Sequence, residues 1–103
     1  MTNERFHRRR RLVETMEHLA EVELPAQAKS DARYPVTEDH CFKRIAFDAA
    51  VGRKWDASVQ RPFYRYATDE QLATAIDVLR SMREQPDRAN ALNRKSLSYR
   101  RSS

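Results

Sequence analysis

The 103-residue chain contains a single glycine and a single cysteine, and both shortages limit the structures it can form. Hairpin turns, bulges and barrel corners usually require several residues that accept a positive φ, so one glycine argues against a β-sheet protein. The lone Cys41 has no internal disulfide partner, which excludes a disulfide scaffold and a cysteine-rich zinc site. We therefore expect a helical protein in a reducing compartment.

Long apolar runs and the common catalytic motifs are missing too. No stretch approaches the roughly 20 residues that span a bilayer, or the shorter apolar core of a signal peptide, which predicts a cytoplasmic protein with no role at a membrane. Glycine-rich phosphate loops, GxSxG, HExxH and zinc-finger spacings are absent. The sequence therefore predicts a non-enzymatic protein with no cofactor, no metal and no catalytic residue.

Charge is abundant: 34% of the residues are charged and the net charge is +5. It is unevenly placed, because residues 1–20 and 81–103 are net basic whereas residues 21–40 are net acidic. Such asymmetry favours an acidic partner, most commonly nucleic acid, although an ordinary solvated basic surface has the same composition.

The spacing of apolar residues predicts an all-α single domain of three or four helices. A first stripe covers residues 3–24 and should end at Pro25. Its ordered part could begin only near Arg11, because the positive end of the helix dipole disfavours preceding arginines. The expected organisation is a basic N-terminal arm at 1–10, which could be mobile, a helical domain at 11–99 and a basic disordered tail at 100–103.

A long loop is expected between the first and second helices. Residues 25–36 contain two prolines and no helical period, and Tyr34 and Val36 should pack this connector onto the domain. The second helix is predicted at 38–51, with Thr37 as its N-cap and Gly52 as its stop signal. Apolar residues lie on two faces of this helix, which should be central, and two acid–base pairs at four-residue spacing should stabilise it, Asp39 with Lys43 and Arg44 with Asp48.

The third helix has the clearest pattern in the chain. Thr68 and Gln71 form a capping-box pattern, and an apolar stripe continues to an end near Glu84 through Leu72, Ala75, Ile76, Leu79 and Met82. A fourth helix is expected from Pro86, with a thinner stripe made of Ala89, Leu92, Ser96 and Tyr99.

An aromatic and basic loop, residues 53–67, separates the second and third helices. Its rings could stack on unpaired bases while its cations contact phosphates, although Trp55 and Phe63 are also the large residues that a small core needs. Together with the two basic ends, this loop defines a candidate nucleic-acid surface: Arg8, Arg9, Arg10, Arg11, Arg53, Lys54, Arg61, Arg65, Arg94, Lys95, Arg100 and Arg101.

The sequence thus favours a small basic protein that engages nucleic acid or a nucleoprotein complex through electrostatic contacts. The alternative is an accessory or inhibitor protein that docks on a larger protein or enzyme, with Trp55, Tyr64 and Tyr66 as anchors. A homodimer is compatible with the small size.

Chemistry at the histidines and the cysteine is less favoured. His40 and Cys41 are adjacent at a helix start, but neighbouring helical residues point about 100° apart, so this imidazole is poorly placed to activate the thiol. His7 and His18 are eleven residues apart, which places them roughly 16 Å apart on a helix, too far to share one metal ion.

Overall fold

The computed structural model of the chain describes residues 2–101, and the helical segments account for most of them. They are α1 (Thr2–His18), the π-helical turn η1 (Leu19–Glu23), α2 (Leu24–Lys29), α3 (Asp39–Val51), the 3₁₀ turn η2 (Trp55–Ala57), α4 (Phe63–Tyr66), α5 (Asp69–Glu84) and α6 (Pro86–Arg101). This range contains no strand, so the predicted all-α single domain is confirmed.

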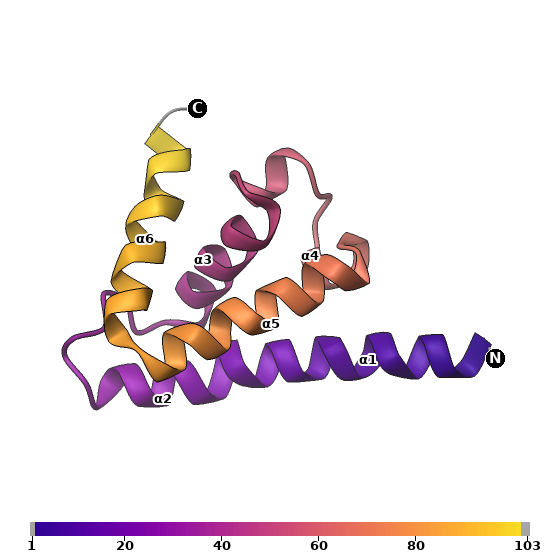
Figure 1. Cartoon of the computed structure of the whole chain (residues 1–103), viewed down its shortest axis with the longest axis horizontal. Helices are drawn as coiled ribbons and strands as arrows, with labels where there is room; N and C mark the ends of the chain where they lie inside the picture. The colour runs from indigo at the N-terminus through magenta and orange to yellow at the C-terminus, as the bar shows by residue number, and fades with distance from the viewer. Residues whose placement is uncertain (1, 102–103) are drawn as a thin grey trace.

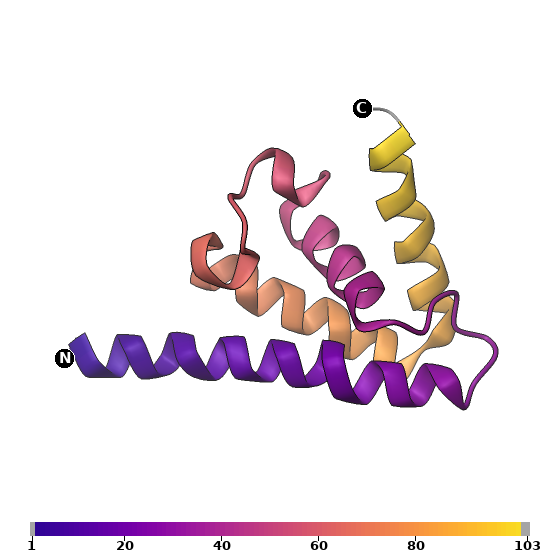
Figure 2. The ribbon, with the colours of Figure 1, turned by 180° about the vertical axis from the view of Figure 1, so that it is seen from behind.

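The first three elements form one long rod along an edge of the molecule, as Figure 1 shows. Helix α5 lies against this rod and runs in the same direction, and α3 packs on α5 from the other side. Helix α6 turns away from the end of α5 and passes beside α3 (Figures 1 and 2). The N-terminal turns of α1 extend beyond the other helices, so the two ends of the chain lie at distant points of the molecule.

The core lies between the rod, α3 and α5. Every member of the predicted α5 stripe is buried, and Phe42, Ile45, Ala46 and Phe47 of α3 meet it from the opposite side. The predicted capping box also forms, because Thr68 accepts from the Gln71 N–H and Gln71 accepts from the Thr68 N–H. In α5 the predicted cap and the predicted apolar stripe are both confirmed, so this helix agrees with its prediction more completely than the other helices do.

The first helix differs from its prediction at both ends. It begins at Thr2 rather than near Arg11, and helical structure continues through Pro25 to Lys29. A proline ring in an α-helix collides with the carbonyl four residues earlier. Here the preceding turn is π-helical, with the Leu24 N–H donating to the Leu19 carbonyl five residues back, and this wider turn precedes the buried proline. The predicted loop at 25–36 therefore shortens to residues 30–38.

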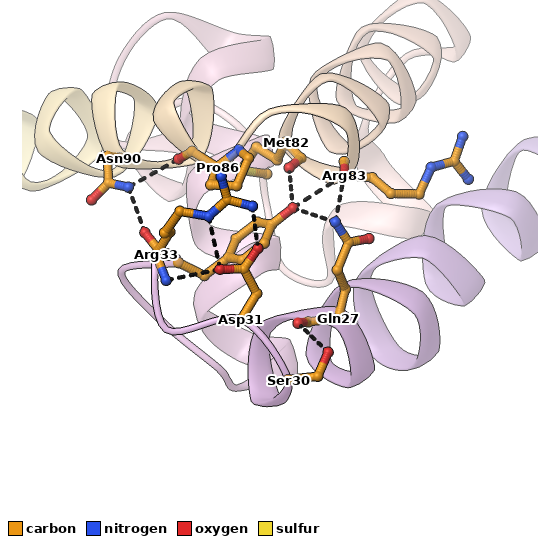
Figure 3. A network of polar contacts seen from close by, with 9 residues as sticks. Gln27, Ser30, Asp31, Arg33, Met82, Arg83, Pro86 and Asn90 are labelled. Carbon is orange, nitrogen blue, oxygen red and sulfur yellow. Dashed lines mark hydrogen bonds and ion pairs between the residues drawn. The ribbon is translucent and has the colours of Figure 1, made fainter.

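Tyr34 of that loop and Gln27 of α2 donate hydrogen bonds to the carbonyl end of α5, within the polar network drawn in Figure 3. Pro86 has no N–H to donate to the Met82 carbonyl, and the Tyr34 hydroxyl donates to it instead, at 2.8 Å. Gln27 donates to the Arg83 carbonyl at 2.7 Å and to the Tyr34 oxygen at 2.6 Å. Burial raises the pKa of the Tyr34 phenol, because the charged form would lose its solvation. Tyr34 and Val36 pack on the core as predicted.

Helix α3 ends where it was predicted to end, with Gly52 at φ 83° in the left-handed region, and it begins at Asp39, one residue after the predicted start. The predicted N-cap at Thr37 is wrong, because Glu38 occupies the cap position and makes no side-chain cap bond. The two predicted pairs within the helix are also wrong: Lys43 binds Glu21 of the rod, and Arg44 binds Asn93 and Ser96 of α6. The i to i+4 spacing allowed the local pairs, but neighbouring helices offer these long side chains other partners.

Helix α6 is joined to α3 largely by polar contacts. It buries Ala89 and Ser96, and Leu92 packs at the edge of the core. The fully buried Asp48 carboxylate of α3 accepts hydrogen bonds from the Ser96 hydroxyl at 2.5 Å, from Arg100 and from the Trp55 N–H at 3.0 Å. This carboxylate therefore joins α3, η2 and α6.

Candidate functional site

The four consecutive arginines of α1 have different surroundings. Arg9 turns toward the start of α5, where it pairs with Asp69 at 2.7 Å and donates to the carbonyls of Tyr64, Arg65 and Ala67. These bonds satisfy carbonyls at the end of α4 and anchor α1, which explains why the helix is ordered well before Arg11. Arg9 therefore has a structural role. Its guanidinium already donates to these four acceptors, which argues against the predicted contact with nucleic acid.

Arg8 and Arg11 line a hollow between α1 and α5. It measures about 350 Å³ and also contains Arg80 and Asp77 of α5. Within residues 2–101 neither Arg8 nor Arg11 forms an ion pair, whereas Arg10 turns aside and pairs with Glu14 at 3.0 Å. The hollow thus has three guanidinium groups and one carboxylate.

A second hollow follows where α1 meets the start of α5. It measures about 540 Å³ and is lined by Arg5, Phe6, Arg9, Thr68 and Asp69. Arg5, Arg8 and Arg11 are three residues apart, so successive arginines rise about 4.5 Å along the helix. We call Arg5, Arg8, Arg11 and Arg80 the arginine seam. It gathers four cations beside the line along which two parallel helices make contact. Two carboxylates line the same hollows, and of these Asp69 pairs with Arg9 whereas Asp77 does not.

The largest aromatic residues of the 53–67 loop belong to the core. Phe63 stacks on Phe47 with ring centroids 3.9 Å apart, and Trp55 meets both rings edge-on at 5.5 and 5.4 Å. The exposed fraction is 7% for Trp55 and 2% for Phe63. Trp55 was predicted as a docking anchor, but its burial leaves only a small part of the ring open, where it lines two surface hollows, too little to anchor a protein partner. Tyr64 and Tyr66 remain 49% and 45% exposed.

The cations of this loop divide into paired and exposed groups. Arg61 pairs with Asp56 at 2.5 Å and lies over the Trp55 ring, while Lys54 approaches the same carboxylate at 4.0 Å. The hydrogen bond from Arg61 lowers the pKa of Asp56, and burial opposes this shift. Arg53 is exposed, and Arg65 lies 5.6 Å from the centre of the Tyr66 ring.

The C-terminal candidates belong to α6, whose final turns lie away from the N-terminal turns of α1 that carry Arg5 and Arg8 (Figure 1). Arg94 and Arg101 are exposed, and Lys95 lies over the Tyr99 ring at 5.8 Å. Arg100 binds the buried Asp48. The two basic ends predicted from the sequence are therefore separate surfaces.

The histidines and the cysteine considered for catalysis and metal binding do not come together within the described part of the chain. His40 is highly exposed, and its Nδ1 lies 3.7 Å from Asp39, whereas no hydrogen bond joins His40 to Cys41 within the described range. Among residues 2–101 no group of three or more His, Cys, Asp or Glu could hold a metal ion. No helix in the same range is long and apolar enough to cross a membrane.

Comparison with family models, with curated proteins and with solved structures finds no match.

Sequence reasoning missed two members of the arginine seam. Arg5 could have been included, because residues 5, 8 and 11 have a spacing that keeps them near one another on a helix. Arg80 could not, since only the packing of α1 against α5 brings it to Arg8 and Arg11.

Proposed function

We propose that the protein is a non-enzymatic binding protein that engages nucleic acid, or a nucleoprotein complex, through the arginine seam. The observation that carries this proposal is the row of Arg5, Arg8 and Arg11 on α1, together with Arg80 of α5, which lines the same hollow as Arg8 and Arg11. Successive arginines of α1 are separated by a rise of about 4.5 Å along the helix, and Arg80 adds a fourth cation from α5. Several cations can therefore contact one backbone at once.

Single-stranded nucleic acid suits the exposed aromatic residues near the seam. Phe6 is 65% exposed and lines the same hollow as Arg5. The Arg9 guanidinium reaches the carbonyls of Tyr64 and Arg65, which places α4 and its exposed tyrosines close to this end of α1. Unpaired bases stack on such rings, while arginines bind the phosphates without reading the sequence.

Fluorescence anisotropy with a labelled single-stranded oligonucleotide tests the proposal. Replacement of Arg5, Arg8 and Arg11 by glutamine should weaken binding by about 100-fold or more and reduce the salt slope of log K by about 2, at about 0.7 per phosphate contact. The matched control replaces Arg88, Arg94 and Arg101, which are exposed residues of α6, by glutamine and changes the net charge equally. If both variants weaken oligonucleotide binding equally, the loss comes from the change in net charge alone, which would contradict the role of the arginine seam.

The alternative, an accessory or inhibitor protein, is favoured by the exposed tyrosines. Tyr64 and Tyr66 are half-exposed on the short helix α4, where they could anchor a protein partner. Such a contact should resist nuclease, depend weakly on salt and weaken when both tyrosines become alanine. The seam variant should leave it nearly unchanged.

A further inference from the structure

A second basic cleft lies on the other side of the molecule, where α6 passes α3 and the turn η2. It measures about 350 Å³. Its lining consists of two aromatic residues and five basic ones, namely Phe47, Trp55, His40, Lys43, Arg44, Arg61 and Arg100. No carboxylate lines it. A concave site with several convergent cations and an apolar floor is the usual form of a small-ligand pocket for anions.

The acidic partners of the cleft cations lie outside its lining. Arg100 binds the buried Asp48, Arg61 binds Asp56, and Lys43 binds Glu21. Each of these three cations is therefore already paired with a carboxylate that does not line the cleft, and a ligand in the cleft would meet cationic side chains.

Arg44 differs from the other three cations. Within residues 2–101 its hydrogen bonds go to neutral groups, the Ser96 hydroxyl at 2.7 Å and the Asn93 side-chain amide oxygen at 2.8 Å. It is half-buried, and no carboxylate of the described chain pairs with it. A guanidinium that is fixed by neutral acceptors loses little conformational freedom on binding and retains its full charge for an anion.

The aromatic floor gives the cleft a second preference. Phe47 and Trp55 pack edge to face with centroids 5.4 Å apart, and Arg61 covers the Trp55 ring at 5.0 Å. A largely apolar hollow of about 290 Å³, which Glu17 also lines, adjoins the cleft, because it shares Lys43, Phe47, Trp55 and Arg61 with it. An anionic group near Arg44 would thus have apolar side chains beside it, and Phe47 and Trp55, each 7% exposed, present a small part of their rings there.

We propose that this cleft binds a small phosphomonoester that has a flat apolar group, with the phosphoryl group held by Arg44, Arg61 and Arg100 and the flat group beside Phe47 and Trp55. Arginine forks bind phosphate in bidentate geometry, and a dianion gains more from several cations than a carboxylate does. This inference does not depend on the arginine seam, since the two surfaces share no residue.

Calorimetric titration of the full chain with phenyl phosphate tests the proposal, and inorganic phosphate and benzoate serve as comparison ligands. Trp55 is the only tryptophan in the chain, so its fluorescence reports on the cleft independently. Phenyl phosphate should bind saturably and more tightly than either comparison ligand. Arg44→Gln and Arg61→Gln should each weaken it by at least about tenfold, the loss of a charge-assisted hydrogen bond.

The matched control is Arg88→Gln, an exposed arginine of α6 that lines neither the cleft nor the arginine seam, which should leave phenyl phosphate binding unchanged. Arg61 has a side chain that is 71% exposed, so Arg61→Gln should fold even if Arg44→Gln does not. Absence of saturable binding, or equal weakening by Arg88→Gln, would overturn the site. Benzoate binding as tight as that of phenyl phosphate would overturn the assignment to phosphate.

Discussion

Helices α5 and α6 each contain 16 residues, yet they are attached to the molecule in different ways. Helix α5 buries five residues, four of them large apolar ones, between the rod and α3, and it has a capping box at its start. Helix α6 buries one alanine and one serine and depends on the contacts of Asp48. Apolar burial attaches α5 regardless of salt, whereas a polar attachment should respond to salt and to substitution of one carboxylate.

The largest expected effect is on the apolar side of this comparison. Leu79→Ala in α5 should lower the free energy of unfolding by about 4 kcal/mol, because it removes a fully buried side chain and leaves a cavity. Leu92→Ala in α6 should lower it by about 1 to 2 kcal/mol, since that side chain is partly buried. Urea denaturation measures both values. Equal losses would show that the two helices are attached alike.

The second effect concerns the buried carboxylate. Asp48→Ala should destabilise the protein by about 3 kcal/mol, because Arg100 and the Trp55 N–H lose a buried partner. Amide hydrogen exchange should then accelerate in α6 more than in α5. Uniform acceleration along the chain would contradict a local attachment by Asp48.

The third effect is at the N-terminus of α5. Thr68→Ala should lower the free energy of unfolding by about 1 kcal/mol, because the Gln71 N–H loses its acceptor. Thr68→Ser retains that acceptor and provides the control. If both variants lose the same stability in thermal melting, the effect does not come from the cap.

The smallest effect depends on pH. Arg61 lowers the pKa of Asp56 in the folded protein, so this pair stabilises the fold fully above the unfolded value of about 3.9 and loses its effect as pH falls through the folded value. Asp56→Asn should therefore be less stable than the wild type near neutrality, and the difference should shrink below about pH 4. Melting temperatures of both proteins across this range measure the effect. A difference that does not change with pH would contradict it.

The sequence predicted those parts of the fold whose signals are local. In α5 the cap residues, the apolar period and the stop lie within one short segment, and structure and prediction agree. The start of α1 could not be predicted in this way, because Arg9 finds its partners about 60 residues away along the chain. The prediction that Pro25 ends the helix was wrong for a related reason, since a proline normally stops a helix and no local pattern of residues marks the π-helical turn just before it.

The candidate site was predicted in part. The arginine run of α1 was recognised, but only the structure separates Arg9 and Arg10, which have internal partners, from Arg8 and Arg11, which line the seam. Lys43 and Arg44 were interpreted as local helix pairs, so their place in the cleft was not expected. Which cations share a surface depends on how helices pack, and composition carries no information about that packing.

The Tyr34 contact with the end of α5 has a consequence for the cleft. Tyr34 binds the last turn of α5 just before the chain bends into α6, and Asn90 in the first turns of α6 donates to the Arg33 carbonyl beside it. The loop therefore braces the bend between the two helices from outside the cleft. Because α6 carries Arg100 to the cleft, the direction that Tyr34 and Asn90 give to this helix also sets where that guanidinium lies.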